Sequence, residues 1–121
     1  MTEDPSLLAG EWHGHYFCGQ GQTGLILTVA QTGSVLTATF AFHPLASNPD
    51  VPAGSFAMRG THDGTHMQLY GDHWMERPTN YEMVGLSANV TGTSPQMITG
   101  FVTTAEGAMS DNCSTFTVER N

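Results

Sequence analysis

The segment from residue 70 to residue 81 gathers side chains that could bind or transform a small molecule. It holds an imidazole, an indole, a carboxylate and a guanidinium, contributed by His73, Trp74, Glu76 and Arg77. An aromatic surface beside one cation and one carboxylate suits a small polar ligand or a sugar. The residues that we expect to contact such a ligand are Tyr70, His73, Trp74, Glu76, Arg77, Tyr81 and, from another loop, His43.

Two other interpretations of this segment stay open. His73 and Glu76 have the chemistry of a general acid and a general base, which would make the protein an enzyme. Alternatively, the segment covers one end of the fold, with Trp74 filling the interior and Arg77 paired with Glu76. Since the sequence holds no Ser-His-Asp order, phosphate-binding loop or nucleophile elbow, we expect a binding protein without a cofactor ahead of a catalyst.

A second pattern places Glu11, His13 and His15 at alternate positions, so that on a β-strand all three side chains would project from one face. Two imidazoles can bind zinc or copper, but they leave the coordination incomplete. We therefore predict an outward polar face and no metal site. His62 and His66 flank a two-residue turn and would point to opposite faces, which argues against a shared site.

The composition describes one compact domain with few cations. The chain has 121 residues, of which 39% are hydrophobic and 12% charged, and its formal net charge is −8. There is no lysine, and the arginines are Arg59, Arg77 and Arg120. Three scattered cations cannot form the basic surface that nucleic acids or anionic membranes require, so we expect neither partner.

Alternation of apolar and polar residues predicts an all-β chain with no helix. The Asp63-Gly64 pair is typical of a type I′ hairpin turn. Longer loops are expected over 43–53, 71–80 and 104–111, with a short turn over 91–95. The expected strands run approximately over 10–18, 23–30, 35–42, 54–61, 66–70, 81–90, 97–103 and 113–120.

These eight sequential strands predict an antiparallel up-and-down β-barrel over residues 8–121, preceded by a flexible tail over 1–7. The connections after the second, fourth and sixth strands are short, whereas those after the third, fifth and seventh are long. One end of the barrel is therefore tight, and the other carries loops. A binding mouth would lie at the loop-rich end, to which Glu106 and Asp111 also belong.

The two cysteines fall at the ends of the first and last strands. A Cys18–Cys113 disulfide would close the barrel, but Cys113 has the opposite parity to the apolar Phe116 and Val118. A β-bulge or a bridge at frayed strand ends would resolve this conflict. The alternative is two buried thiols. The acidic first residues do not form a signal peptide, so we expect a cytoplasmic protein if Met1 is the native start and an exported one if a leader was removed.

Gly10-x-Trp12 at the start of the first strand and Arg120 at the end of the last strand resemble the calycins, the lipocalin and avidin type of barrel. The resemblance implies a tryptophan that closes the base and an arginine that packs across it. The longer pattern from Trp12 to Leu25, with its Gly14, Tyr16 and Cys18, looks like the start of small all-β bacterial modules of undefined function.

Three functions follow, in this order. The first is a calycin-like module that binds a small polar or amphipathic molecule at the loop-rich mouth. The second is a solid barrel that acts as a structural or interaction module and self-associates into a homo-oligomer, for which Phe17 offers an apolar outer side chain. The third is an enzyme that uses His73 and Glu76. A hollow interior favours the first function and a filled interior the second.

Overall fold

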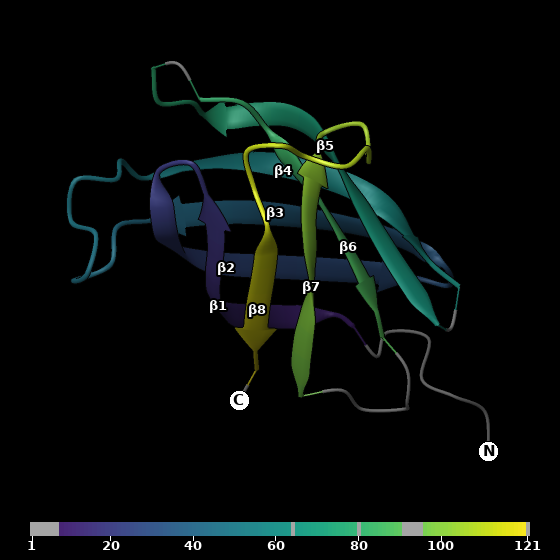
Figure 1. The fold of residues 1–121 in the computed structure, drawn as a ribbon. Helices are drawn as coiled ribbons and strands as arrows, with labels where there is room; N and C mark the ends of the chain where they lie inside the picture. Colours follow the sequence, from purple (N-terminus) through teal and green to yellow (C-terminus); the bar gives the residue numbers. More distant parts are fainter. Residues whose placement is uncertain (1–7, 64, 80, 91–95, 121) are drawn as a thin grey trace.

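The chain folds into a closed antiparallel barrel in which each strand pairs with the next and the last pairs with the first (Figure 1). The computed structural model describes residues 8–63, 65–79, 81–90 and 96–120. The all-β, up-and-down prediction is confirmed. The strands are β1 (Gly10–Cys18), β2 (Gly21–Thr32), β3 (Val35–His43), β4 (Gly54–His62), β5 (His66–Glu76), β6 (Val84–Asn89), β7 (Met97–Thr104) and β8 (Thr115–Glu119).

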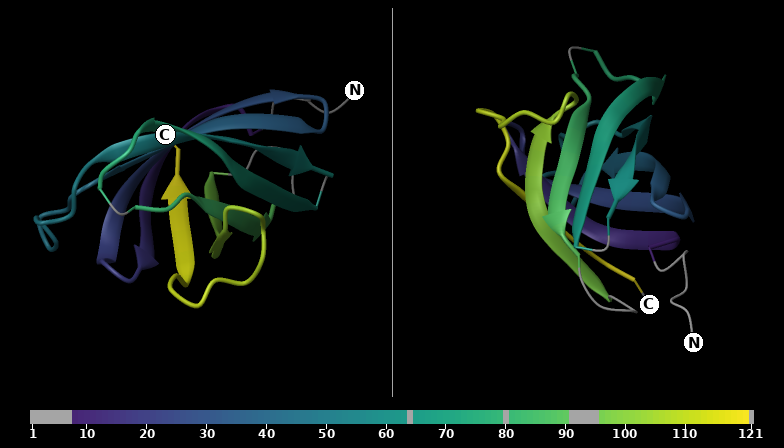
Figure 2. Two further views of the ribbon diagram at one scale, coloured as in Figure 1. Left: turned by 90° about the horizontal axis from the view of Figure 1, so that it is seen from above. Right: turned by 90° about the vertical axis from the view of Figure 1, so that its right-hand side faces the viewer.

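Three predictions fall on residues outside the described ones: the tail over 1–7, the Gly64 position of the hairpin turn and the turn over 91–95. The long connection after β3, residues 44–53, extends beyond the strands in Figure 1 and in the left view of Figure 2. In the described part of the chain, no helix is long and apolar enough to cross a membrane.

The loop predicted over 71–80 is wrong for residues 71–76, which continue β5 as a strand paired with β4. Two register shifts interrupt this pairing, between Ser55 and Phe56 and between Ala57 and Met58. Each shift breaks the two-residue alternation by which a strand is recognised in a sequence. As a result, Trp74 packs against the core while His73 stays exposed.

Two other differences in strand boundaries affect the site and the disulfide. β6 begins at Val84 instead of residue 81, so Tyr81 lies in the connection between β5 and β6. β8 begins at Thr115, so Cys113 precedes the strand. This second difference removes the parity conflict, because Phe116 and Val118 point inward without any constraint from the cysteine.

Cys18 and Cys113 are joined by a disulfide. Tyr16 pairs with Phe116 across β1 and β8, and the Ser114 amide donates a hydrogen bond to the Phe17 carbonyl (2.9 Å). The bridge therefore forms just outside the paired strands. Of the two expected ways to resolve the parity conflict of Cys113, this is the bridge at the strand ends and not the β-bulge. It fixes the segment before β8 to the end of β1.

The tight end of the barrel is filled around Trp12, which is completely buried. Its indole N–H donates to the Leu8 carbonyl (3.0 Å), and the guanidinium carbon of Arg120 lies 4.4 Å from the ring centre. Arg120 also donates from Nη1 to the Ala9 carbonyl (2.9 Å). Gly10 has a φ of +134°, a backbone conformation that disfavours other residues. Together these contacts close the base of the barrel.

Candidate functional site

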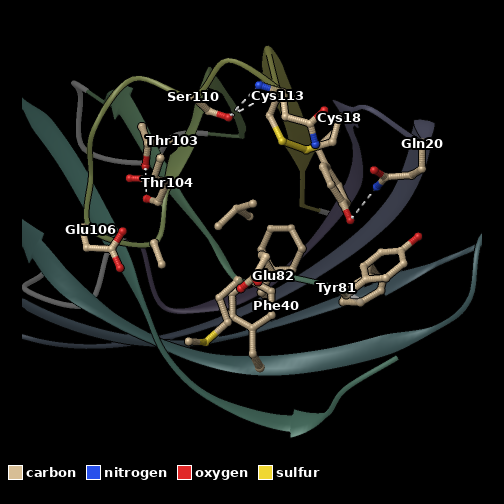
Figure 3. A pocket seen from close by; sticks show the side chains of 17 residues that line it. Cys18, Gln20, Phe40, Tyr81, Glu82, Thr103, Thr104, Glu106, Ser110 and Cys113 are labelled. Atoms are coloured by element: carbon tan, nitrogen blue, oxygen red, sulfur yellow. Dashed lines mark hydrogen bonds between the residues drawn. A yellow bond between two sulfur atoms is a disulfide. The ribbon is translucent and has the colours of Figure 1, made fainter. Parts of the chain in front are cut away.

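The loop-rich end of the barrel holds a cavity of about 560 Å³ (Figure 3). Its lining comes from the barrel interior and from three connections, those after β1, β5 and β7. A volume of this size falls in the range of small-molecule sites. The barrel is therefore filled at its base and hollow at its mouth.

The floor of the cavity is aromatic because inward positions of neighbouring strands carry large rings. Phe40 and Phe42 alternate along β3, and Phe40 pairs with Phe56 of β4. The Phe40 and Phe56 rings stack with centres 4.7 Å apart, and Tyr16 of β1 meets Phe40 edge-on at 5.0 Å. All four side chains line the cavity, but they are almost completely buried, with Phe40 0% and Phe56 1% exposed. These rings therefore close the bottom of the cavity, and the partly exposed side chains of Tyr81, Met83 and Val84 supply the apolar surface that a ligand can reach.

A hydroxyl group stands on this apolar floor. Tyr16 is only 3% exposed, and its hydroxyl accepts a hydrogen bond from Nε2 of Gln20 (3.3 Å). The Thr23 hydroxyl is a second hydrogen-bond partner of the Tyr16 hydroxyl. Burial raises the pKa of Tyr16 above its ordinary value, so the phenol stays protonated at neutral pH. Its hydrogen can therefore go to the Thr23 oxygen or to an acceptor on a molecule in the cavity.

Gln20 is itself held in place by the long connection between β3 and β4. Asn48 donates from Nδ2 to the carbonyls of Gln20 (2.7 Å) and Gln22 (3.1 Å). Gln20 also donates to the Thr23 hydroxyl (3.1 Å). Figure 3 shows Gln20 at the margin of the cavity, with its hydrogen bond directed inward. The 44–53 connection thus positions a polar group of the site without lining it.

The opposite wall is polar and carries carboxylates. Figure 3 shows Glu106 beside Thr103 and Thr104. The Thr104 hydroxyl accepts the Ala108 amide (3.0 Å), and the Ser110 hydroxyl accepts the Cys113 amide (3.1 Å). The charged residues among those that line the cavity are Glu82 and Glu106, both exposed. The mouth therefore combines an apolar floor with a polar, negatively charged rim.

Comparison with known protein families, with curated proteins and with solved structures finds no match for this chain.

Trp74, Arg77 and Tyr81 form a layered contact next to the cavity. Tyr81 stacks on Phe42 with ring centres 5.4 Å apart, and Trp74 meets the edge of Phe42 at 6.2 Å. Arg77 lies 5.7 Å from the Trp74 ring and donates from Nε to the Tyr81 carbonyl (2.9 Å). Of the seven residues predicted to contact a ligand, Tyr81 lines the cavity. Trp74 and Arg77 lie outside the lining, in contact with the residues that form it. Partial burial raises the pKa of Tyr81.

The other four predicted ligand contacts lie outside the cavity lining. His73 is exposed on the outer face, where Nδ1 lies 3.0 Å from a carboxylate oxygen of Asp72. Glu76 ends β5 opposite Ser55. Tyr70 is partly exposed, and the ring of His43 lies beside the Pro44 carbonyl (3.1 Å). The structure thus places His73 beside Asp72 and brings it into no described contact with Glu76.

The interpretation of this segment as a cover expected Arg77 to pair with Glu76. In the structure, Arg77 lies near Glu82 instead. Its Nη2 is 3.9 Å from Oε1 of Glu82, with both side chains largely in solvent. Glu82 had no signal in the sequence, because a lone glutamate inside the strand predicted over 81–90 looks like any outward surface charge. The floor residues did have one, since alternation marks Phe40 and Phe42 as inward.

The histidines of the first strand face outward. Nε2 of His13 lies 2.8 Å from Oε1 of Glu11, and His15 meets Phe17 edge-on at 5.4 Å. In the part of the chain that the structure describes, no three His, Cys, Asp or Glu side chains are placed to hold a metal ion. His62 is buried and contacts the Val90 carbonyl (2.9 Å), whereas His66 is exposed beside Asn89.

Proposed function

We propose that the protein binds a small amphipathic molecule in the mouth cavity, as a binding module of calycin-like shape. The observation that carries this proposal is the cavity of about 560 Å³ over an aromatic floor. An apolar part of the ligand would contact the partly exposed Tyr81, Met83 and Val84 above this floor, and a polar part would face the rim. The buried Tyr16 hydroxyl supplies a hydrogen-bond donor between these two regions.

The polar group at the floor admits an acceptor on the ligand. The Tyr16 hydroxyl has the Thr23 hydroxyl as a partner, and a carbonyl, ether or hydroxyl oxygen of a ligand at that depth can accept the phenol hydrogen in its place. A ligand with an acceptor within its apolar part therefore fits the site.

The first experiment is a titration with N-phenyl-1-naphthylamine, a neutral apolar dye whose emission rises in an apolar site. Trp74 packs on Phe42 and Phe56 of the floor, so bound dye should also quench tryptophan emission. Saturable emission at one site per chain supports the proposal. Absence of saturable binding would contradict it.

A matched pair of variants locates the bound dye. Val84 lines the cavity, and Val35 is 55% exposed on β3 away from it. Val84→Phe fills part of the cavity and should weaken dye binding at least tenfold, whereas Val35→Phe should leave it unchanged. Thermal unfolding of both variants checks that the barrel remains folded. Equal dye binding by the two variants would place the dye elsewhere.

Self-association is the second candidate, and an outer face of β1, β8 and β7 favours it. Phe101 is 66% exposed and pairs with Thr115 of β8, and Phe17, 38% exposed, lies near the start of β8, where its carbonyl accepts the Ser114 amide. Large exposed apolar side chains on one face are typical of contact surfaces. Sedimentation velocity tests this candidate: association that Phe101→Ser abolishes and Val35→Ser preserves would support it, and a monomer at high concentration would oppose it.

A further inference from the structure

We infer that the mouth cavity selects cationic amphiphiles, such as hydrophobic amines, over anionic ones of the same shape. This inference rests on the proposed function, because it names the class of molecule that the same cavity would bind. It draws on the sign and position of the charges around the cavity, which the dye titration does not address.

The charges that line the cavity are all negative among the described residues. Glu82 and Glu106 contribute carboxylates, and none of the three arginines is part of the lining. A ligand headgroup at the rim therefore meets negative charge. An anionic headgroup would be repelled there, and a cationic one attracted, with the interaction weakened by water and salt.

The two carboxylates are not equally available. Glu82 has Arg77 within 3.9 Å, although both side chains are largely in solvent and such pairs are weak. Glu106 has no hydrogen bond or ion pair with any described residue. Arg77 in turn donates to the Tyr81 carbonyl and lies against Trp74. Glu106 is thus the carboxylate more open to a ligand cation.

The polarity of the site matches a molecule with one charged end. The interior of the cavity, where the partly exposed Tyr81, Met83 and Val84 lie over the floor of aromatic rings, accepts an apolar body and lacks charge. The carboxylates are at the exposed rim, where an ammonium group keeps part of its hydration while its chain is buried. A net charge of −8 on the whole chain acts in the same direction at longer range.

The hydroxyl groups do not reverse this preference. The Ser110 hydroxyl accepts the amides of Asn112 (3.2 Å) and Cys113 (3.1 Å) and donates to no acceptor among the described residues, so it can donate to a ligand. Such donors bind neutral oxygens as well as anions. Since no lining cation accompanies them, a carboxylate headgroup gains hydrogen bonds but still faces two like charges.

The test compares three molecules with one alkyl chain: octylammonium, octanol and octanoate at pH 7. Each displaces N-phenyl-1-naphthylamine from the wild-type protein. We expect octylammonium to compete about three- to tenfold better than octanol, the size expected for one or two exposed ion pairs, and octanoate to compete less well than octanol. The difference in affinity between octylammonium and octanoate should decrease as the salt concentration rises.

Variants distinguish the effect of the rim carboxylates on ligand preference from the effect of the net charge of the chain. Glu106→Gln should remove most of the octylammonium advantage, Glu82→Gln should remove less, and the double variant should abolish it while octanol binds as before. Glu119→Gln makes the same charge change at the opposite end of the barrel, on the last residue of β8. It should leave the advantage in place.

The outcomes distinguish this inference from the function on which it rests. If octanol and the dye bind but octanoate equals or exceeds octylammonium, or if the double variant keeps the full advantage, the inference is wrong and the binding function stands. If neither the dye nor any of the three molecules binds, the proposed function is wrong and the inference falls with it.

Discussion

The guanidinium of Arg120 covers the ring of Trp12, 4.4 Å from guanidinium carbon to ring centre, although the two residues are near opposite ends of the sequence. The same arginine donates to the Ala9 carbonyl. This contact ties the segment before β1 to the segment after β8. It closes the base of the barrel at the seam where the first and last strands meet.

Replacement of Arg120 by methionine should lower the free energy of unfolding by about 1–3 kcal/mol, since a cation–π contact and a charged hydrogen bond are lost while the apolar stem remains. Urea unfolding followed by tryptophan emission measures the effect. Arg59→Met is the control, because its side chain is 72% exposed. Equal stability of the two variants would show that Arg120 contributes nothing specific at the base.

The Cys18–Cys113 disulfide spans 95 residues of sequence and therefore restricts the unfolded chain strongly. A Cys18→Ala, Cys113→Ala double variant should lose about 2–5 kcal/mol of stability. Denaturant unfolding of the variant and of wild-type protein under reducing conditions should agree. A variant that unfolds together with the oxidised wild type would contradict this account.

Trp74 packs on Phe42 and Phe56 and lies outside the cavity lining, so its main effect should be on stability. Trp74→Ala should cost about 2–4 kcal/mol in unfolding free energy, toward the lower range for buried aromatic residues because it is only partly buried. Its neighbour Met75 is 57% exposed, and Met75→Ala should cost little. Loss of dye binding with unchanged stability would instead place Trp74 in the ligand contact.

Asp63 accepts hydrogen bonds from the amides of Thr65 (2.9 Å) and His66 (2.8 Å), which lowers its pKa from 3.8 to about 2. Because the pKa is lower in the folded state, this stabilisation is complete above about pH 4 and disappears as the pH falls toward 2. Asp63→Asn removes the titration. The difference in unfolding free energy between wild type and Asp63→Asn should shrink as the pH falls from about 4 toward 2. A difference that does not depend on pH would contradict the lowered pKa of Asp63.

The sequence by itself determined the class of fold. Strict alternation of apolar residues, as in β3 from Leu36 to Phe42, reports a strand buried on one face, and the sorting of short and long connections predicts which end carries the mouth. It also predicts inward positions for Phe40 and Phe42. These signals are local, because each depends only on residues a few positions apart.

Only the tertiary structure decided which side chains form the site. Residues 71–76, predicted as a loop, form a bulged part of β5. In this strand Trp74 lies behind the floor of the cavity and His73 lies on the outer face. The cavity instead joins Tyr16, Glu82 and Glu106, which are far apart in the chain and meet only when the barrel closes. Register between distant strands depends on pairing and packing of the whole sheet, which no short stretch of sequence encodes.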